Sequence, residues 1–440
     1  MQDKKQLVKP RTLSGFMELL PEKQILFNQM KQIIQSTYEK FGFLPLDTPI
    51  IEAAEVLLAK AGGDTEKQIY RFQKRENDLA LRFDLTVPLA KYVAAHQSEI
   101  GFPFRRYQIG KVYRGERAQA GRFREFYQCD IDVIGEGDLS LIYDAELPAV
   151  IYQIFKQFQL GDFKIHINNR KLLNGLLEEL ELNDKATQVL RIIDKIDKIG
   201  KEAVIEELGE LGIDYTKTNQ MIEFITMQGN IEETLSFLEK RNSTNELFLQ
   251  GLTELKQVVQ NVKIFGVPEK NYGIDLKIAR GLDYYTGTVY ETFLDDYRSL
   301  GSVCSGGRYE DLAGYYTTQK LPGVGISIGL TRLFYKLNEL NLIQVNQKSI
   351  AKVLILPASQ QETQKCLALG TKLRENNINT EVYLNEKKLK TKLKYADRLQ
   401  VPYIVILGEE EVQKEIVTLK NMQTGEQKQL TEEELIDVLK

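Results

Sequence analysis

Residues 114–135 combine side chains suited to a ligand that carries both negative and positive charge. Four arginines lie there, Arg114, Arg117, Arg122 and Arg124. The alternating segment 126–134 then places an amide and two carboxylates two residues apart, at Gln128, Asp130 and Asp132, and a strand carries such residues on one face. Guanidinium groups pair with phosphate oxygens, and carboxylates accept hydrogen bonds from ammonium groups. The segment predicts a hairpin that binds phosphates at its tip and an amine on its return strand. The alternative is an exposed hairpin with solvated charges.

A second group of chemically useful side chains occupies residues 280–291, R-G-L-D-Y-Y-T-G-T-V-Y-E. It joins Arg280 to the tyrosine pair Tyr284 and Tyr285. A tyrosine offers an apolar wall with a polar tip, which suits a flat ring that carries hydrogen-bonding nitrogens. A tight hairpin with a buried tyrosine explains the same residues equally well.

Two glycine-rich segments follow, S-G-G-R-Y at 305–309 and G-V-G-I-S-I-G-L-T-R at 323–332. Glycine lets a backbone approach a ligand closely, but most such runs only mark turns. No Gly-Lys-Ser/Thr follows, so this is not a phosphate-binding loop of the Walker type. The glycine spacing also fails the dinucleotide-binding pattern, and these segments alone predict little.

The elements that must position these groups alternate between strands and helices. Apolar residues at helical spacing predict a helix over residues 26–41, which ends at Gly42. Pro45 and Pro49 punctuate the extended segment 44–52, which therefore belongs at a sheet edge or an interface. Further strands are expected at 79–84, 164–168, 273–292 and 302–333, with helices at 86–95 and 140–157. Residues 171–262 carry only amphipathic helical patterns, which indicates a helical insertion.

The last ninety residues predict a separate small domain. Strands at 353–356, 380–384 and 403–407 alternate with helices at 360–375 and 387–399, and two more strands precede a final helix. This alternation is typical of an α/β domain with a largely parallel sheet. The expected domains are a core in two parts, 1–170 and 263–343, the insertion at 171–262, and the C-terminal domain at 349–440.

Composition excludes several functional classes. The 440 residues carry a net charge of −4, so a nucleic-acid partner must be bound by local patches. Three scattered cysteines and two histidines argue against a disulfide framework, a structural zinc site and Ser-His-Asp or Cys-His catalysis. We find neither a signal peptide nor an apolar run long enough to span a bilayer, and therefore expect a cytoplasmic protein without a membrane partner.

Taken in order, these segments resemble the histidyl-tRNA synthetases, a family of class II aminoacyl-tRNA synthetases. The Pro49 segment resembles class II motif 1, residues 114–128 resemble motif 2, and residues 323–332 resemble motif 3. Residues 280–285 and 305–309 resemble the two signature peptides of the family, and 394–408 resembles its anticodon-binding domain. The resemblance covers nearly the whole chain. Asp84 and Asp132 stand where many bacterial members carry glutamate, as in the other major branch of the family.

The resemblance implies a fold, a reaction and a set of partners. The expected fold is an α+β catalytic core, in which helices flank an antiparallel sheet, with a helical insertion and a C-terminal α/β domain. The carboxylate of L-histidine attacks the α-phosphorus of ATP, and the histidyl group then passes to the 3′-terminal adenosine of histidine tRNA. Mg²⁺ is expected with ATP, no metal is expected on histidine or cysteine side chains, and motif 1 implies a homodimer.

Roles for individual residues also follow from the resemblance alone. Arg114 and Arg280 would be catalytic and hold the α-phosphate. Glu116 would order ATP or its magnesium, while Phe126 and Arg332 would enclose the adenine. The histidine-binding residues would be Asp84, Thr86, Gln128, Asp132, Arg280, Tyr284 and Tyr285. Of these, Asp132 and Tyr285 would read the imidazole. Arg117, Gln119 and Arg122 would contact tRNA, and lysines 387, 388, 390, 392 and 394 would lie near the anticodon or form a solvated helix face.

Three rival functions remain. A regulatory paralogue of the first enzyme of histidine biosynthesis would lack the C-terminal domain and parts of the R-G-L-D-Y-Y peptide, and this chain has both. A module that senses uncharged tRNA would tolerate the loss of Arg114, Arg280 or Arg332, and all three are present. A generic nucleotide-binding α/β enzyme explains the arginines but not their coincidence with the tyrosine peptide.

Overall fold

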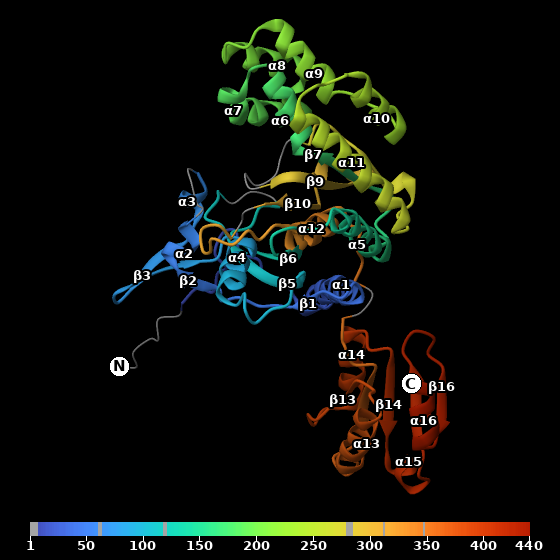
Figure 1. The fold of residues 1–440 in the computed structure, drawn as a ribbon. Coiled ribbons are helices and arrows are strands. Elements are labelled where there is room, and N and C mark those ends of the chain that lie inside the picture. The colour runs from blue at the N-terminus through green and yellow to red at the C-terminus, as the bar shows by residue number, and fades with distance from the viewer. Residues whose placement is uncertain (1–7, 60–63, 118–120, 279–284, 311–312, 346–347) are drawn as a thin grey trace. The chain divides into compact units, whose positions relative to one another are not determined.

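The computed structural model describes residues 8–59, 64–117, 121–278, 285–310, 313–345 and 348–440. The chain forms two compact units. The first contains Lys31–Leu342 together with the chain up to Met17, and the second contains Glu18–Met30 and Ile343–Lys440. Figure 1 shows the elements of each unit.

An eight-stranded sheet forms the centre of the first unit, in the order β1-β5-β6-β11-β10-β9-β7-β8. Only the outermost pairs, β1 with β5 and β7 with β8, run parallel, so the sheet is mainly antiparallel, as the sequence predicts. Two long strands, β5 and β6, pair antiparallel and form the predicted arginine hairpin. The strands are β1 (Leu44–Pro45), β5 (Phe104–Tyr113), β6 (Glu125–Ile134), β7 (Phe163–Asn169), β8 (Tyr272–Ile274), β9 (Tyr285–Leu294), β10 (Cys304–Tyr309) and β11 (Gly323–Ile328).

Helices pack against this sheet through apolar faces. α5 (Ile142–Phe158) buries its apolar residues against β7, β10 and β11, and α12 (Leu330–Glu339) packs on β6. The Tyr38 hydroxyl of α1 (Pro21–Lys40) donates to the carbonyl of Cys129 at 2.8 Å, which fixes the end of this helix on β6. Short helices η2 (Glu269–Asn271) and η3 (Asp295–Leu300) lead into β8 and out of β9.

A small sheet carries the segment before the arginine hairpin. Its order is β2-β4-β3, and α4 follows it. Arg82, buried just after β4, donates from Nε to the carbonyl of Lys111 at 2.8 Å and from Nη1 to that of Thr48 at 2.5 Å. It therefore holds the chain at Asp84 against β5. The elements are β2 (Ile51–Ala53), α2 (Ala54–Leu58), α3 (Asp64–Gln68), β3 (Arg71–Lys74), β4 (Asn77–Leu81) and α4 (Thr86–Ala95).

The predicted insertion consists entirely of helices. Side chains that accept from backbone N–H groups begin several of them: Asn169, Asp214, Asn230 and Asn245. The last helix, α11, returns along α6 and α5 to the sheet. The helices are α6 (Arg170–Glu179), η1 (Asn183–Lys185), α7 (Ala186–Ile193), α8 (Ile196–Glu210), α9 (Tyr215–Ile225), α10 (Ile231–Lys240) and α11 (Glu246–Ile264).

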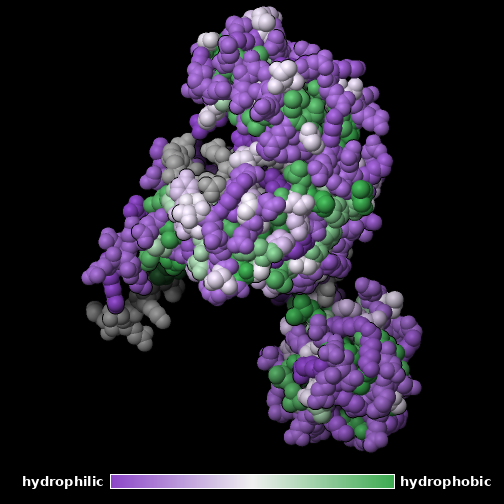
Figure 2. Space-filling model, viewed as in Figure 1, coloured by the Kyte–Doolittle hydropathy of each residue, from purple (hydrophilic) through white to green (hydrophobic). Residues whose placement is uncertain are grey.

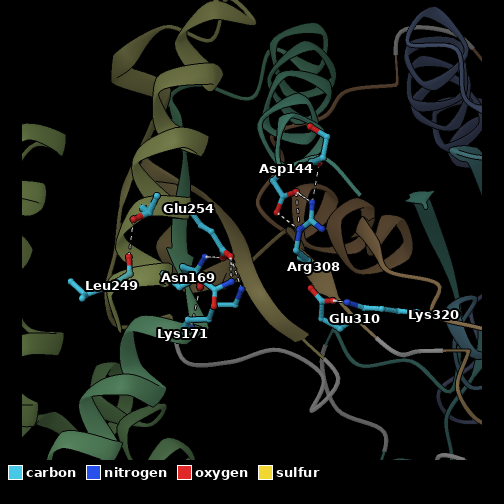
Figure 3. A network of polar contacts seen from close by, with 11 residues as sticks. Asp144, Asn169, Lys171, Leu249, Glu254, Arg308, Glu310 and Lys320 are labelled. Atoms are coloured by element: carbon cyan, nitrogen blue, oxygen red, sulfur yellow. Dashed lines mark hydrogen bonds and ion pairs between the residues drawn. The ribbon is translucent and has the colours of Figure 1, made fainter. Parts of the chain in front are cut away.

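A buried polar cluster joins the insertion to the sheet. Glu254 of α11 accepts from Asn169 Nδ2 at 2.8 Å and from Lys171 Nζ at 2.5 Å (Figure 3). Both donors lie where β7 passes into α6. Because the cluster pairs its buried charges, it holds the first and last helices of the insertion together without leaving a buried charge uncompensated.

The second unit contains a five-stranded sheet in the order β13-β12-β14-β15-β16. The prediction of a largely parallel sheet was wrong in part, because β14–β15 and β15–β16 pair antiparallel. Only the short α15 joins β14 to β15 and a tight turn joins β15 to β16, and neither connection can return a strand in parallel. The elements are β12 (Val353–Pro357), α13 (Thr363–Glu375), β13 (Thr380–Val382), α14 (Leu389–Leu399), β14 (Tyr403–Leu407), α15 (Glu409–Gln413), β15 (Val417–Asn421), β16 (Gln427–Leu430) and α16 (Glu432–Leu439).

Figure 2 shows that hydrophilic residues cover most of the visible face of this unit. Its apolar residues are instead gathered on the two faces of the sheet, under α13 and α16 on one side and α14 on the other. Across both units, none of the described helices has the length and hydropathy that crossing a bilayer requires.

Candidate active site

A cleft of about 530 Å³ lies over the middle of the eight-stranded sheet. The strand register places a polar row across its floor, and this row runs from β5 to β9. Its members are Gln108, Asp130, Ser327, Ser305 and Glu291. The predicted period-2 face of β6 therefore points into this cleft, and neighbouring strands extend the face with hydrogen-bonding side chains.

The adjacent row explains why glycines occur on β10 and β11. There Arg106 and Asp132 stand beside Gly325 and Gly307, with Val289 at the far end. A Cβ atom on Gly325 would lie 2.1 Å from Asp132 Oδ1, and one on Gly307 would lie 3.0 Å from the Tyr285 ring. The glycines therefore leave room for a carboxylate and an aromatic ring.

Arg114 lies at the phosphate-binding end that the sequence predicts. Its Nε donates to the carbonyl of Phe83 at 3.3 Å, and its guanidinium lies 4.3 Å from the Phe83 ring centroid and 5.1 Å from that of Phe126. Two aromatic rings thus hold the planar cation on the cleft wall. Arg122 and Glu116 line the same wall, with Nη1 and Oε2 3.7 Å apart.

Arg332 reaches the same end of the cleft from α12. Its Nη2 donates to the carbonyl of Leu300 at 2.9 Å. Burial and the nearby charge of Arg122 lower the pKa of Arg332, although a guanidinium keeps its proton at neutral pH. Arg114, Arg122 and Arg332 together give this end of the cleft the positive charge that a polyphosphate requires.

Asp84 lies just before α4 and next to Phe83, the residue that Arg114 contacts. Its Oδ1 accepts from the backbone N–H groups of Thr86 at 3.1 Å and Val87 at 2.9 Å. Burial raises the pKa of this carboxyl, whereas these two hydrogen bonds and the charge of Arg114 lower it. The helix start therefore holds Asp84 in one orientation beside Thr86, which also lines the cleft.

Asp132 lies under the cleft and is not among its lining residues. Its Oδ2 is 2.5 Å from Nη2 of Arg106, a fully buried side chain, and its Oδ1 accepts from the Tyr309 hydroxyl at 3.0 Å. Burial raises the pKa of Asp132 to about 6, and Arg106 and Tyr309 oppose that shift. Asp132 is thus a buried acceptor whose charge Arg106 offsets.

Asp130 and Gln128 form the centre of the cleft floor. Gln128 Nε2 donates to Ser327 Oγ at 2.9 Å, so that its amide group is fixed on the floor. Burial raises the pKa of Asp130 to about 7, despite the charge of Arg106 and a hydrogen bond from Ser327. Oδ1 of Asp130 and Oε1 of Gln128 have no hydrogen-bond partner among the described residues.

The structure brings together most of the residues to which the resemblance gives roles. The residues that line the one cleft are Asp84, Thr86, Arg114, Glu116, Arg122, Phe126, Gln128, Tyr285 and Arg332. Arg117 is exposed near the hairpin tip, while Gln119, Arg280 and Tyr284 lie outside the described residues. Arg124 instead donates to the backbone carbonyl of Glu116 at 3.0 Å, so this arginine shapes the hairpin.

Several polar cleft residues received no individual role from the resemblance, among them Asp130, Glu291, Ser327 and Lys336. Strand alternation places Asp130 on the same face of β6 as Gln128 and Asp132, but no signal within the sequence shows which strands lie next to β6. Among the described residues, no group of three or more histidine, cysteine or acidic side chains is arranged to hold a metal ion.

Arg308 of the S-G-G-R-Y peptide has a structural position. Its Nη2 lies 2.5 Å from Oδ2 of Asp144, its Nε donates to the same carboxylate, and Nη2 also donates to the carbonyl of Ser140 (Figure 3). Both charged groups are buried. The pair ties β10 to the start of α5 and so supports the cleft floor from below.

Comparison with known proteins gives consistent results over the whole chain. The family model described as histidyl-tRNA synthetase matches residues 15–333, and that described as anticodon binding domain matches residues 352–440. Histidine--tRNA ligase of Clostridium tetani is 56% identical over 438 residues, which are 99% of each chain. The enzyme of the same name from Finegoldia magna is 48% identical, with 99% of this chain and 100% of that protein covered. The crystal structure of histidyl-tRNA synthetase from Nostoc sp. PCC 7120 superimposes with a TM-score of 0.92 at 39% identity, covering 98% of this chain and 99% of that one.

Proposed function

The chain belongs to the histidyl-tRNA synthetase family, and we propose that the cleft over its central sheet is where histidine is activated. The chain is a histidine--tRNA ligase of class II. It activates L-histidine with ATP to histidyl-adenylate and transfers the histidyl group to the 3′ end of histidine tRNA. The observation that supports this site is that one cleft is lined both by arginines and by hydrogen-bond acceptors.

The arginines of the cleft suit ATP. Arg114 and Arg280 would contact the α-phosphate and stabilise the charge that develops there when the histidine carboxylate attacks. Phe126 and Arg332 would enclose the adenine, since a guanidinium stacks well on a flat ring. The protein forms no covalent bond in this scheme, and its contribution is alignment and charge stabilisation.

The hydrogen-bond acceptors of the cleft suit histidine. Asp84 and Gln128 would take the α-ammonium group, and Thr86 would help to position the carboxylate. Asp132 and Tyr285 would read the imidazole, with Arg280 and Tyr284 completing the pocket. A pocket that satisfies both ring nitrogens rejects analogues without them by roughly 10⁴–10⁵, because buried polar groups would be left unpaired.

The cleft also fits the magnesium ion that accompanies ATP. Glu116 and Glu291 place carboxylates on its lining, and Mg²⁺ commonly takes one or two protein carboxylates with phosphate oxygens and water. These two residues would hold the ion, which when bound would neutralise phosphate charge. The other contacts proposed above for ATP and histidine are made by side chains and do not involve the ion.

The tRNA would meet the chain at two places. Arg117, Gln119 and Arg122, at the tip of the arginine hairpin, would contact the acceptor stem. In the C-terminal unit, the exposed lysines near and on α14 would contact the anticodon: Lys387, Lys388, Lys390 and Lys394. Lys392 would not, since it is buried and its Nζ donates to the carbonyl of Pro357 at 2.6 Å.

We also propose the domain division, the assembly and the location that the sequence predicts. The domains are the core at 1–170 and 263–343, the insertion at 171–262 and the anticodon-binding domain at 349–440. The chain would act as a homodimer in the cytoplasm. The β1 strand at the edge of the sheet supports dimerisation, because Leu44, Ile50 and Ile51 expose apolar side chains along and beside it.

ATP–pyrophosphate exchange without tRNA tests the proposed site and reaction. Each of the twenty amino acids is offered separately to the purified protein. Exchange with histidine alone is the expected result, because only histidine carries the imidazole for which the pocket is built. Absence of exchange with every amino acid in folded protein would favour the regulatory or tRNA-sensing function.

A further inference from the structure

The floor of the cleft contains a carboxylate to which the proposed mechanism gives no role. Asp130 lines the cleft between Gln128 and Asp132 on β6, directly across from Ser327 of β11. Only 3% of Asp130 is exposed to solvent. A buried carboxylate is costly unless a cation or hydrogen-bond donors offset its charge, so its position requires an explanation.

The neighbouring carboxylates already have their partners. Asp132 has the guanidinium of Arg106 and the hydroxyl of Tyr309. Asp84 has two backbone N–H donors at the start of α4. Asp130 has no ion-pair partner within the part of the chain that the structure describes, and its Oδ1 accepts no hydrogen bond there. Apart from a hydrogen bond from Ser327, Asp130 therefore has fewer partners than Asp84 or Asp132 among the described residues.

The surroundings of Asp130 define the ligand that it fits. Gln128 Oε1 beside it also lacks a hydrogen-bond partner, and the Gln128 amide nitrogen is already used on Ser327. The floor thus offers acceptors to the cleft. Such a site fits a group that carries several N–H donors and a positive charge, and an ammonium group, with three donors, is the simplest example.

We propose that Asp130 binds the α-ammonium group of the substrate histidine and, with Asp84 and Gln128, supplies one acceptor for each of its three hydrogens. This inference rests on the proposed function. The charge of the bound ammonium would offset the desolvation of Asp130, which raises its pKa in the ligand-free protein. The imidazole would remain with Asp132 and Tyr285.

Binding of three ligands to an Asp130→Asn variant tests the proposal. Asparagine keeps the size of the side chain but removes its charge. L-Histidine and L-histidinol both carry the ammonium group and the imidazole, whereas imidazole-4-propionic acid lacks the ammonium.

We expect the dissociation constants of histidine and histidinol for the Asp130→Asn variant to rise at least about tenfold, since charge-assisted hydrogen bonds are stronger than neutral ones. Those of imidazole-4-propionic acid and ATP should stay within about twofold. Asp78→Asn, which removes an exposed carboxylate paired with Arg71 outside the cleft, should change none of them.

Two results would overturn the proposal. Equal weakening of all three histidine-like ligands would assign Asp130 to the imidazole or to the shape of the floor, and unchanged binding would remove it from the site. If Asp130→Asn does not fold, Asp130→Ser provides the same comparison. Failure of the proposed function is distinguishable, because the unaltered chain would then show no histidine-dependent pyrophosphate exchange.

Discussion

At the scale of single residues, the cleft is organised by buried charge. One fully buried cation, Arg106, lies close enough to three buried carboxylates, Asp84, Asp130 and Asp132, to lower the pKa of each. It pairs with only one of them, Asp132. The arrangement leaves the floor with an excess of negative charge, which favours a cationic substrate.

Removing Asp132 should separate histidine recognition from ATP binding. In Asp132→Ala, the imidazole loses its acceptor and Arg106 loses its counter-ion, so we expect kcat/KM for histidine in pyrophosphate exchange to fall on the order of 10²-fold or more. The dissociation constant of ATP should change little, because Arg114, Arg122 and Arg332 are unaltered. Normal activation of histidine by this variant would contradict the role of Asp132 in the pocket.

The raised pKa of Asp130 should appear in the pH dependence of stability. Its pKa is about 7 in the folded chain and about 4 in an unfolded one. Between these values the folded state keeps a proton that the unfolded state has lost, so the free energy of unfolding falls as pH rises. Above pH 7 both states are ionised and the fall ends.

Chemical unfolding at pH 5 and at pH 8 measures this fall. Between the two pH values, the free energy of unfolding should decrease more in the ligand-free chain than in Asp130→Asn, by on the order of a few kcal/mol. The charged neighbours of Asp130, namely Arg106, Asp132 and Asp84, are common to both proteins, so parallel pH dependences would contradict this assignment.

At the scale of elements, β11 shapes the site because Gly325 has no side chain. Gly325 faces Asp132 across the β6–β11 pair, and a methyl group there would collide with the carboxylate and with the backbone carbonyl of Ile131. The same strand supplies Ser327 to the cleft floor. β11 thus leaves space for the carboxylate of Asp132 and supplies Ser327 as a hydrogen-bond donor to Asp130.

Gly325→Ala should therefore damage histidine binding more than folding or ATP binding. The added Cβ would lie 2.1 Å from Asp132 Oδ1, so Asp132 must move away from Arg106 and Tyr309. We expect KM for histidine in the exchange assay to rise at least about tenfold. Gly273→Ala, on the edge strand β8, is the matched control, since the added Cβ would meet only the flexible end of the Lys164 side chain. Equal effects of the two substitutions would show that the glycine serves the sheet and not the pocket.

At the scale of the whole molecule, the chain divides its work between two compact units. The first contains the cleft, and the second contains the domain that matches the anticodon-binding model. A net charge of −4 does not attract tRNA by itself, so local groups of cations must do so.

Replacing Lys387, Lys388, Lys390 and Lys394 together by glutamine should raise KM for tRNA in aminoacylation. The expected rise is at least about tenfold at 0.1 M salt, and the salt dependence of tRNA binding should become shallower. Pyrophosphate exchange, which needs no tRNA, should be unchanged. A normal KM for tRNA in this variant would show that the four lysines form a solvated helix face and do not contact tRNA.

Sedimentation equilibrium tests the proposed homodimer. The expected mass is twice the 50.5 kDa of one chain. Replacement of the exposed apolar residues Leu44 and Ile51 by lysine should shift the mass toward that of one chain, since a charge buried at an interface is costly. A mass of 50.5 kDa for the unaltered protein would rule out the dimer.

The sequence by itself determined the family, the hairpin with its polar face, the helical insertion and the C-terminal α/β domain. Strand alternation, helical spacing and signature peptides are local properties that can be recognised without a fold. Only the tertiary structure decided which partners the carboxylates on this face of β6 have. It assigns Asp132 to Arg106 and to Tyr309, which lies 177 positions away, and leaves Asp130 open to the cleft. It likewise buries Lys392 among the lysines of α14 and reverses β15 against β14. These outcomes depend on which strands become neighbours and in what register, and such pairings are set by packing between distant segments.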